Sequence, residues 1–207
     1  MLPFGAVVLK AYECVNNVKV GSHTSGYAPF SFDITPALVA KNNKLVVRVW
    51  DPTDKSYQPR GKQVSTPSGI WYAPVSGIWQ TVWLEPVGEK HIANLRILPD
   101  VDRNLLKVDA CVVEHDATDM LEVNVYDGNQ LVASGKSING EPVDVIMPEN
   151  VKLWSPDSPF LYTLKVNLLS KGKVMDKVDS YAAMRKFSTK RDANGIVRLE
   201  LNNQPLF

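Results

Sequence analysis

The sequence has few of the residues from which metal sites and disulfides are built. Its 207 residues include only two cysteines, Cys14 and Cys111, and three histidines that lie far apart. The cysteines fall in different predicted domains, so we expect buried free thiols rather than a disulfide. The histidines lack the spacing of a zinc site. We therefore expect no metal centre and no cofactor.

A charge excess and long apolar runs are also missing. The chain has 23 basic and 22 acidic residues and no long basic run, so we expect no nucleic-acid partner. No apolar stretch reaches the roughly 20 residues of a membrane span, so we expect no membrane partner. The first residues, MLPFGAVVLKAYE, lack the basic region and cleavage site of a signal peptide.

Apolar residues instead recur at every second position, which is the pattern of half-buried β-strands. This alternation is clear over residues 106–112, 121–125 and 160–168. Only one short helix is expected, over residues 35–40, with Thr35 as N-cap and Pro36 in the first turn. The sequence therefore predicts an all-β protein.

Two further patterns predict buried segments in the first half of the chain. The nearly continuous apolar run LVVRVW at 45–50 predicts a central strand covered on both faces, with Trp50 in the core. Trp79 and Trp83 would lie on one face of a strand, where we expect them to fill the core or the junction between domains rather than contact sugar. Asn16-Asn17 predicts a two-residue hairpin turn.

The chain changes character twice. Residues 51–74 are irregular and rich in Pro, Lys, Gln, Ser and Gly, whereas regular strands follow Pro86. After residue 88, turn residues recur about every 8 to 15 positions, as in a β-sandwich. A second change near Arg185 precedes a predicted hairpin around Asn194-Gly195.

Several phrases together resemble one protein family. GSHTSGYAPFSFDIT at 21–35, LVVRVWDPTD at 45–54 and SGIWQTVWLEPV at 76–87 resemble the N-terminal sugar-binding domain of family 2 glycoside hydrolases. This family includes β-galactosidases, β-glucuronidases and β-mannosidases. LWSPDSPFLYTLKV at 153–166 resembles its immunoglobulin-like domain. LELNNQPLF at 199–207 resembles the hairpin that leads into its catalytic barrel, with Asn203 where glycine is usual.

The resemblance implies a domain arrangement and places catalysis in a domain outside these residues. Residues 1–87 would be a truncated galactose-binding-like jelly roll, residues 88–188 an immunoglobulin-like β-sandwich, and residues 189–207 a hairpin entering a missing (β/α)8 barrel. The family keeps its two catalytic glutamates in that barrel, so we expect no catalytic residue here and an inactive chain. The parent enzyme would hydrolyse β-glycosidic bonds with retention. Relatives are often periplasmic or extracellular, and the location of this chain stays open.

The loop at 51–72 carries the candidate binding residues. It combines hydroxyl-binding groups with aromatic faces, which suits sugars. By resemblance, it would reach towards the active site of the barrel. This implies a substrate-proximal role for five residues: Asp51, Arg60, Lys62, Trp71 and Tyr72. Solvated charges and packing tryptophans are the alternative interpretation of the same residues.

Three functions remain open at this stage. The chain is expected to be the non-catalytic part of a family 2 glycosidase, which binds carbohydrate weakly or indirectly and supports the missing barrel. The alternatives are a stand-alone carbohydrate-binding module and a purely structural β-sandwich scaffold. Missing early strands would expose part of the core, so we also expect a homodimer that covers residues 4–15.

Overall fold

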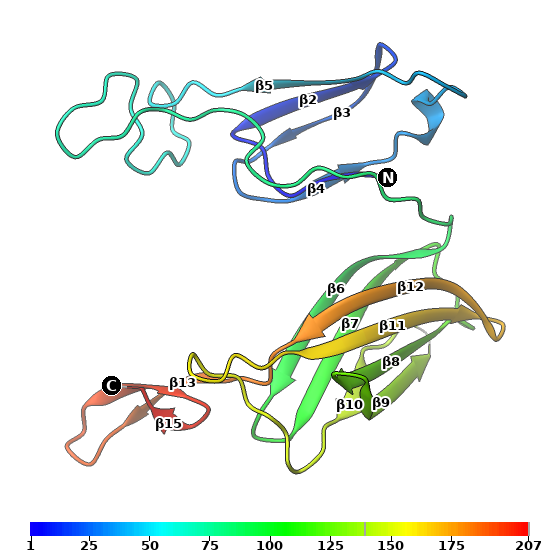
Figure 1. Cartoon of the computed structure of the whole chain (residues 1–207), viewed down its shortest axis with the longest axis vertical. Helices are drawn as coiled ribbons and strands as arrows, with labels where there is room; N and C mark the ends of the chain where they lie inside the picture. The colour runs from blue at the N-terminus through cyan, green and yellow to red at the C-terminus, as the bar shows by residue number, and fades with distance from the viewer. Residues whose placement is uncertain (139, 207) are drawn as a thin grey trace. The chain divides into compact units, whose positions relative to one another are not determined.

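The computed structural model describes residues 1–138 and 140–206, and its regular secondary structure is β-strand apart from one short 3-10 turn (Figure 1). Asn139 and Phe207, the last residue of the LELNNQPLF motif, lie outside the described residues. The chain divides into two compact units, unit 1 (Met1–Pro86) and unit 2 (Val87–Phe207). The all-β prediction is confirmed.

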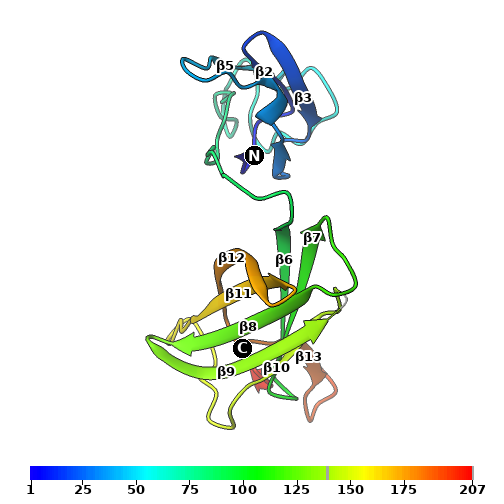
Figure 2. The same cartoon turned by 90° about the vertical axis from the view of Figure 1, so that its right-hand side faces the viewer.

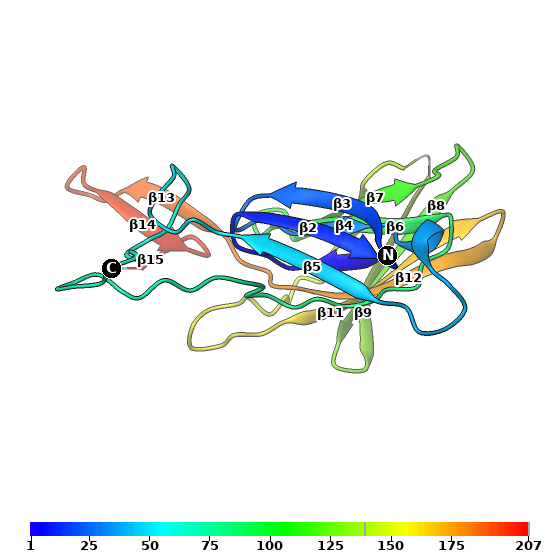
Figure 3. The same ribbon diagram turned by 90° about the horizontal axis from the view of Figure 1, so that it is seen from above.

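Unit 1 contains five strands in two small sheets. They are β1 (Leu2–Phe4), β2 (Lys10–Val15), β3 (Val18–Thr24), β4 (Phe30–Phe32) and β5 (Leu45–Trp50). One sheet has the order β3-β2-β5, visible in Figure 3, and β1 pairs with β4 in the other. Asn16 (φ 52°) and Asn17 (φ 66°) form the predicted turn between β2 and β3. Asparagine tolerates these left-handed angles better than most residues.

The core of unit 1 forms against one face of β2. Ala11 and Val15 are buried there and pack with Phe4 and Val7. These side chains are buried within the single chain because a later segment closes over part of residues 4–15, and the homodimer that would cover this segment stays a prediction. Phe4 and Val7 form isolated bridges with residues 82 and 78, and the amide of Gly5 donates to the carbonyl of Thr81.

Strand β5 differs from its prediction. It pairs only with β2, so it is an edge strand rather than a central one. Its residues Val46 and Trp50 are 44% and 50% exposed, so Trp50 does not lie in the core. Only Val47 and Val49 pack inward. A continuous apolar run is compatible with burial on both faces, but the number of covered faces depends on neighbouring strands.

The predicted helix is shorter than expected. Only a 3-10 turn forms, η1 (Thr35–Ala37), and it is the one helical element among the described residues. Ile34, not Thr35, occupies the N-cap position. The carboxylate of Asp33 accepts the amide of Thr35 at 2.9 Å and takes over the capping role. Leu38 ends the turn with an extended backbone.

Unit 2 is a two-layer sandwich with the three-plus-four strand division of an immunoglobulin-like fold. The sheet β10-β7-β6 packs against the sheet β12-β11-β8-β9 (Figure 2). The strands are β6 (His91–Asp100), β7 (Leu105–Val113), β8 (Met120–Asp127), β9 (Gln130–Ile138), β10 (Val143–Ile146), β11 (Tyr162–Ser170) and β12 (Lys173–Ala182).

The alternating segments of the sequence supply the core of this sandwich. Leu106 and Val108 come from β7, Val123 from β8, and Leu164 and Val166 from β11, and each is at most 1% exposed. Both sheets contribute to this one cluster. The three strands predicted from period-two alternation are therefore confirmed.

Both cysteines are free, but their burial differs from the prediction. Cys14 is partly buried, and Cys111 is exposed. Leu106, Val108 and Ala110 are buried on one face of β7, so Cys111 falls on the opposite face of the sheet.

The tail of unit 2 folds as a small three-stranded sheet. Its strands are β13 (Phe187–Arg191), β14 (Val197–Leu201) and β15 (Gln204–Pro205). Asn202 and Asn203 have φ of 53° and 65°, a region that favours glycine. The Asn203 amide also donates to Asp102 at 2.7 Å. Hydrogen bonds from Lys186 and Asn203 hold the pKa of Asp102 below its usual range.

Gly21 in β3 tests the packing of unit 1. A Cβ atom at this position would lie 2.0 Å from the Phe32 ring. We expect Gly21→Ala to lower the free energy of unfolding by about 2 kcal/mol, since the ring must move out of its place. Gly26→Ala is the matched control, because its Cβ would meet nothing closer than 3.6 Å. Urea denaturation measures the free energy of unfolding of both variants, and an equal decrease in the two would contradict the packing argument.

Candidate functional site

The loop that follows β5 is held closed by Asp51. One carboxylate oxygen of Asp51 accepts the amide of Thr53, and the other accepts the hydroxyl of Ser76, both at 2.9 Å. One side chain thus joins the beginning of the loop to the segment that follows its end. The loop is therefore an organised part of unit 1 rather than a free connection.

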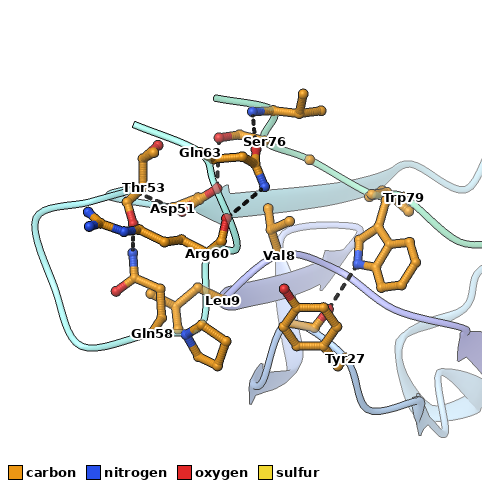
Figure 4. Close-up of a pocket in the computed structure, with 15 residues that line it drawn as sticks. Val8, Leu9, Tyr27, Asp51, Thr53, Gln58, Arg60, Gln63, Ser76 and Trp79 are labelled. Atoms are coloured by element: carbon orange, nitrogen blue, oxygen red, sulfur yellow. Dashed lines mark hydrogen bonds between the residues drawn. The ribbon is translucent and has the colours of Figure 1, made fainter. Parts of the chain in front are cut away.

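This closure creates a pocket of about 320 Å³, drawn in Figure 4. Four segments far apart in the sequence line it, and all belong to unit 1. The lining residues are Val8, Leu9, Gly26, Tyr27, Asp51, Thr53, Gln58, Pro59, Arg60, Gln63, Val75, Ser76, Gly77, Ile78 and Trp79.

Two aromatic rings form one end of the pocket. Tyr27 and Trp79 contact edge to face, with ring centroids 5.9 Å apart and an interplanar angle of 69°. The Trp79 indole donates to the carbonyl of Gly26 at 2.9 Å, which fixes its orientation. Both rings remain open to solvent, at 61% and 49% exposure. They offer the apolar surface on which the C–H face of a sugar can stack.

The placement of Trp79 corrects the prediction that it fills the core. Trp83, its predicted core partner, is 44% exposed. Residues 76–84 form isolated bridges rather than a strand, so period-two spacing does not apply to them. The core positions of this segment are taken by residues such as Val82 instead.

Polar side chains from the loop form the other end of the pocket. Gln63 accepts the amide of Val75 at 2.6 Å and donates to the carbonyl of Arg60 at 3.4 Å. Gln58 donates to the carbonyl of Thr53, whereas its own side-chain oxygen is buried without a partner. These groups, with Asp51, can donate to and accept from hydroxyl groups of a ligand.

The polar end of the pocket also contains a residue with a strained backbone conformation. Thr53 has φ of 55°. A β-branched residue rarely adopts this conformation, and such strain is found most often at functional sites. Thr53 is held there because its amide donates to Asp51 and its carbonyl accepts from Gln58.

Only two of the five residues predicted from the sequence line the pocket. Asp51 and Arg60 line the pocket, whereas Lys62, Trp71 and Tyr72 do not. The amide of Tyr72 donates to the carbonyl of Lys62 at 2.8 Å, so these segments of the loop pair with each other. The Arg60 guanidinium lies 5.9 Å from the Trp71 ring and links the two parts.

Sequence reasoning missed the aromatic end of the pocket. Tyr27 precedes β4 and lies far from the loop in sequence, so no local signal connects it with residues 51–72. Trp79 stood out by its aromatic surroundings but was assigned to the core. Their proximity comes from the chain path around β2 rather than from any spacing.

The pocket lining contains few charged side chains. Asp51 is the only carboxylate among the lining residues, and both of its oxygens accept hydrogen bonds. A retaining glycosidase needs two carboxyl groups about 5 Å apart. Asp54 lies outside the pocket lining, where hydrogen bonds from Ser65 and the charge of Arg60 lower its pKa. Within residues 1–138 and 140–206, no cluster of three metal-binding side chains occurs.

Comparison with known proteins identifies the family. The model for "Glycosyl hydrolases family 2" matches residues 90–185. A protein named "Putative beta-glucuronidase" from Formosa agariphila is 32% identical over 197 residues, which cover 91% of this chain and 23% of that protein. A β-galactosidase from Thermoanaerobacter pseudethanolicus is 27% identical over 98% of this chain and 28% of its own length. Residues 90–185 therefore belong to a domain of glycoside hydrolase family 2.

Solved structures of family 2 enzymes share the fold. A β-glucuronidase from Ruminococcus gnavus superposes on the whole chain with a TM-score of 0.75 at 20% identity. A β-glycosidase from Bacteroides vulgatus gives a TM-score of 0.74 over 99% of the chain at 22% identity. The chain spans 36% and 25% of these proteins. The chain thus has the same fold as the matched part of these two structures. Among the described residues, no helix is long and apolar enough to cross a membrane.

Proposed function

We propose that this chain is the non-catalytic part of a retaining β-glycoside hydrolase. Its pocket contacts sugar, and its sandwich supports a catalytic barrel. The observation that carries this proposal is the pocket of unit 1, where the rings of Tyr27 and Trp79 face a polar end that includes Asp51 and Arg60. The names of its relatives, which include β-glucuronidase and β-galactosidase, favour a β-glycoside as the ligand.

Trp79→Ala tests the pocket. We expect this change to weaken binding of 4-nitrophenyl β-glucuronide or β-galactoside about fivefold, since one stacking ring contributes on the order of 1 kcal/mol. Trp83→Ala is the matched control, because Trp83 is similarly exposed but does not line the pocket. Isothermal titration of the 207-residue chain measures both. Equal binding by both variants would reject the pocket and favour a purely structural scaffold.

A turnover assay on the same samples separates binding from catalysis. The proposal expects no release of 4-nitrophenol, because the pocket lining contains only one carboxylate. Activity that copurifies with the chain would overturn the non-catalytic assignment.

Trp71→Ala and Tyr72→Ala test the other surface of the loop. A loss of binding in these variants alone would move the sugar contact there.

A further inference from the structure

A second hollow lies on the opposite side of the β3-β2-β5 sheet from the core of unit 1. It is a shallow depression of about 580 Å³, lined by Lys10, Tyr12, Cys14, Lys19, Val46, Arg48 and Trp50. The core-facing residues of β2 are Ala11, Glu13 and Val15, so Tyr12 and Cys14 point the other way. We call these seven residues the outer face. Figure 3 shows the three strands side by side.

Strand register arranges the outer face in rows. Lys10 lies opposite Trp50, and Tyr12 lies opposite Arg48. Each of these rows therefore contains one cation and one aromatic ring. The third row places Cys14 between Lys19 and Val46. Successive rows on one face of a sheet are roughly 7 Å apart.

The outer face is positively charged and unneutralised. It contains three cations and no acidic residue. In the parts of the chain that the structure covers, none of these cations forms an ion pair with a carboxylate. Instead, the ammonium groups of Lys10 and Lys19 lie 5.2 and 5.8 Å from the Tyr12 ring. Such a cluster attracts an anionic ligand, and its arginine can bind a carboxylate through two hydrogen bonds.

We propose that the outer face binds a short acidic oligosaccharide made of uronic acid units. Each uronate carries one carboxylate and one apolar ring face, which matches a row with one cation and one aromatic ring. Three rows span roughly 14 Å, which limits the ligand to a few sugars. The site is separate from the pocket, since the two linings share no residue. It therefore does not depend on the proposed function.

The test is titration of the 207-residue chain with trigalacturonate by isothermal calorimetry at low salt. We expect binding that weakens as salt is added, because the attraction is between exposed charges. Arg48→Gln and Trp50→Ala should each weaken binding about tenfold. Lys41→Gln and Trp83→Ala are matched controls, because both residues are exposed and lie outside the outer face. Thermal unfolding confirms that all variants are folded.

Binding of three other ligands, and the oligomeric state of the chain, provide outcomes that would contradict the proposal. Equal binding of the neutral trisaccharide would overturn the role of charge. Tighter binding of a sulfated trisaccharide would overturn the assignment to carboxylates. Tighter binding of a single-stranded oligonucleotide would make this face a nucleic-acid site, since bases also stack on aromatic rings. Light scattering that shows a dimer lost in Trp50→Ala would assign the face to a second copy. Absence of binding to trigalacturonate would reject the site.

Discussion

Glu13→Leu is expected to stabilise unit 1 by about 3 kcal/mol above pH 8 relative to the native chain. Glu13 is fully buried on the core face of β2, and neither of its carboxylate oxygens has a hydrogen-bond partner. Burial raises the pKa of this carboxyl to about 7, against smaller opposing effects from its own backbone amide and from the charge of Lys19. Leucine has a similar size and carries no charge that must be removed from water.

The same group makes the stability of unit 1 depend on pH. Below about pH 4.5, Glu13 is protonated in both the folded and the unfolded chain. Between pH 4.5 and about 7, only the folded chain holds the proton, so the free energy of unfolding falls by about 1.4 kcal/mol per pH unit. Above pH 7 both states are ionised, and the loss is complete. The contribution of the protonated carboxyl is therefore present at acidic pH and absent at alkaline pH.

Urea denaturation from pH 4 to pH 9, followed by tryptophan fluorescence, measures this effect. Four of the five tryptophans lie in unit 1, so fluorescence reports mainly on this unit. Glu13→Gln is the control, because it removes the titration but keeps a buried polar group. We expect both variants to lose the pH slope and only Glu13→Leu to gain the full stability. An unchanged slope in Glu13→Leu would show that another group is responsible.

Leu164→Ala is expected to destabilise unit 2 by about 4 kcal/mol. Leu164 is 0% exposed and lies in the middle of β11, which is hydrogen-bonded to β8 on one side and β12 on the other. Its side chain packs in the cluster shared by both sheets. Shortening it leaves a cavity that neighbouring side chains cannot easily fill.

Leu161→Ala is the matched control for this prediction. Leu161 is the same residue type three positions earlier, but it is 46% exposed. We expect its loss to be below about 1 kcal/mol, because little apolar surface returns to water. Hydrogen exchange of peptides from β8 and β11 locates the effect in unit 2. Equal exchange rates in the two variants would contradict the assignment of Leu164 to the core.

Local patterns determined much of unit 2. Alternation in a strand sends neighbouring side chains to opposite faces, so every second residue from Tyr162 to Leu168 could be assigned to a buried face before any partner strand was known. Turn chemistry is equally local, which is why Asn16 and Asn17 could be placed in a hairpin turn. The quoted motifs also connected the chain with family 2 glycoside hydrolases, because they keep the same order along the sequence.

The tertiary structure alone decided the features on which the proposals depend. Nothing in the run at 45–50 shows whether a strand will pair on one side or both, so β5 was mistaken for a central strand. Glu13 stands in an alternating segment, but its complete burial is seen only in the folded structure. One pocket is lined by Tyr27, Arg60 and Trp79, and only the folded chain brings them to it. The sequence by itself determined the periodicity, the turns and the family resemblance, because these depend on residues that are neighbours in the chain. Burial and the two binding surfaces were decided only by the tertiary structure, because they depend on contacts between residues far apart in the chain.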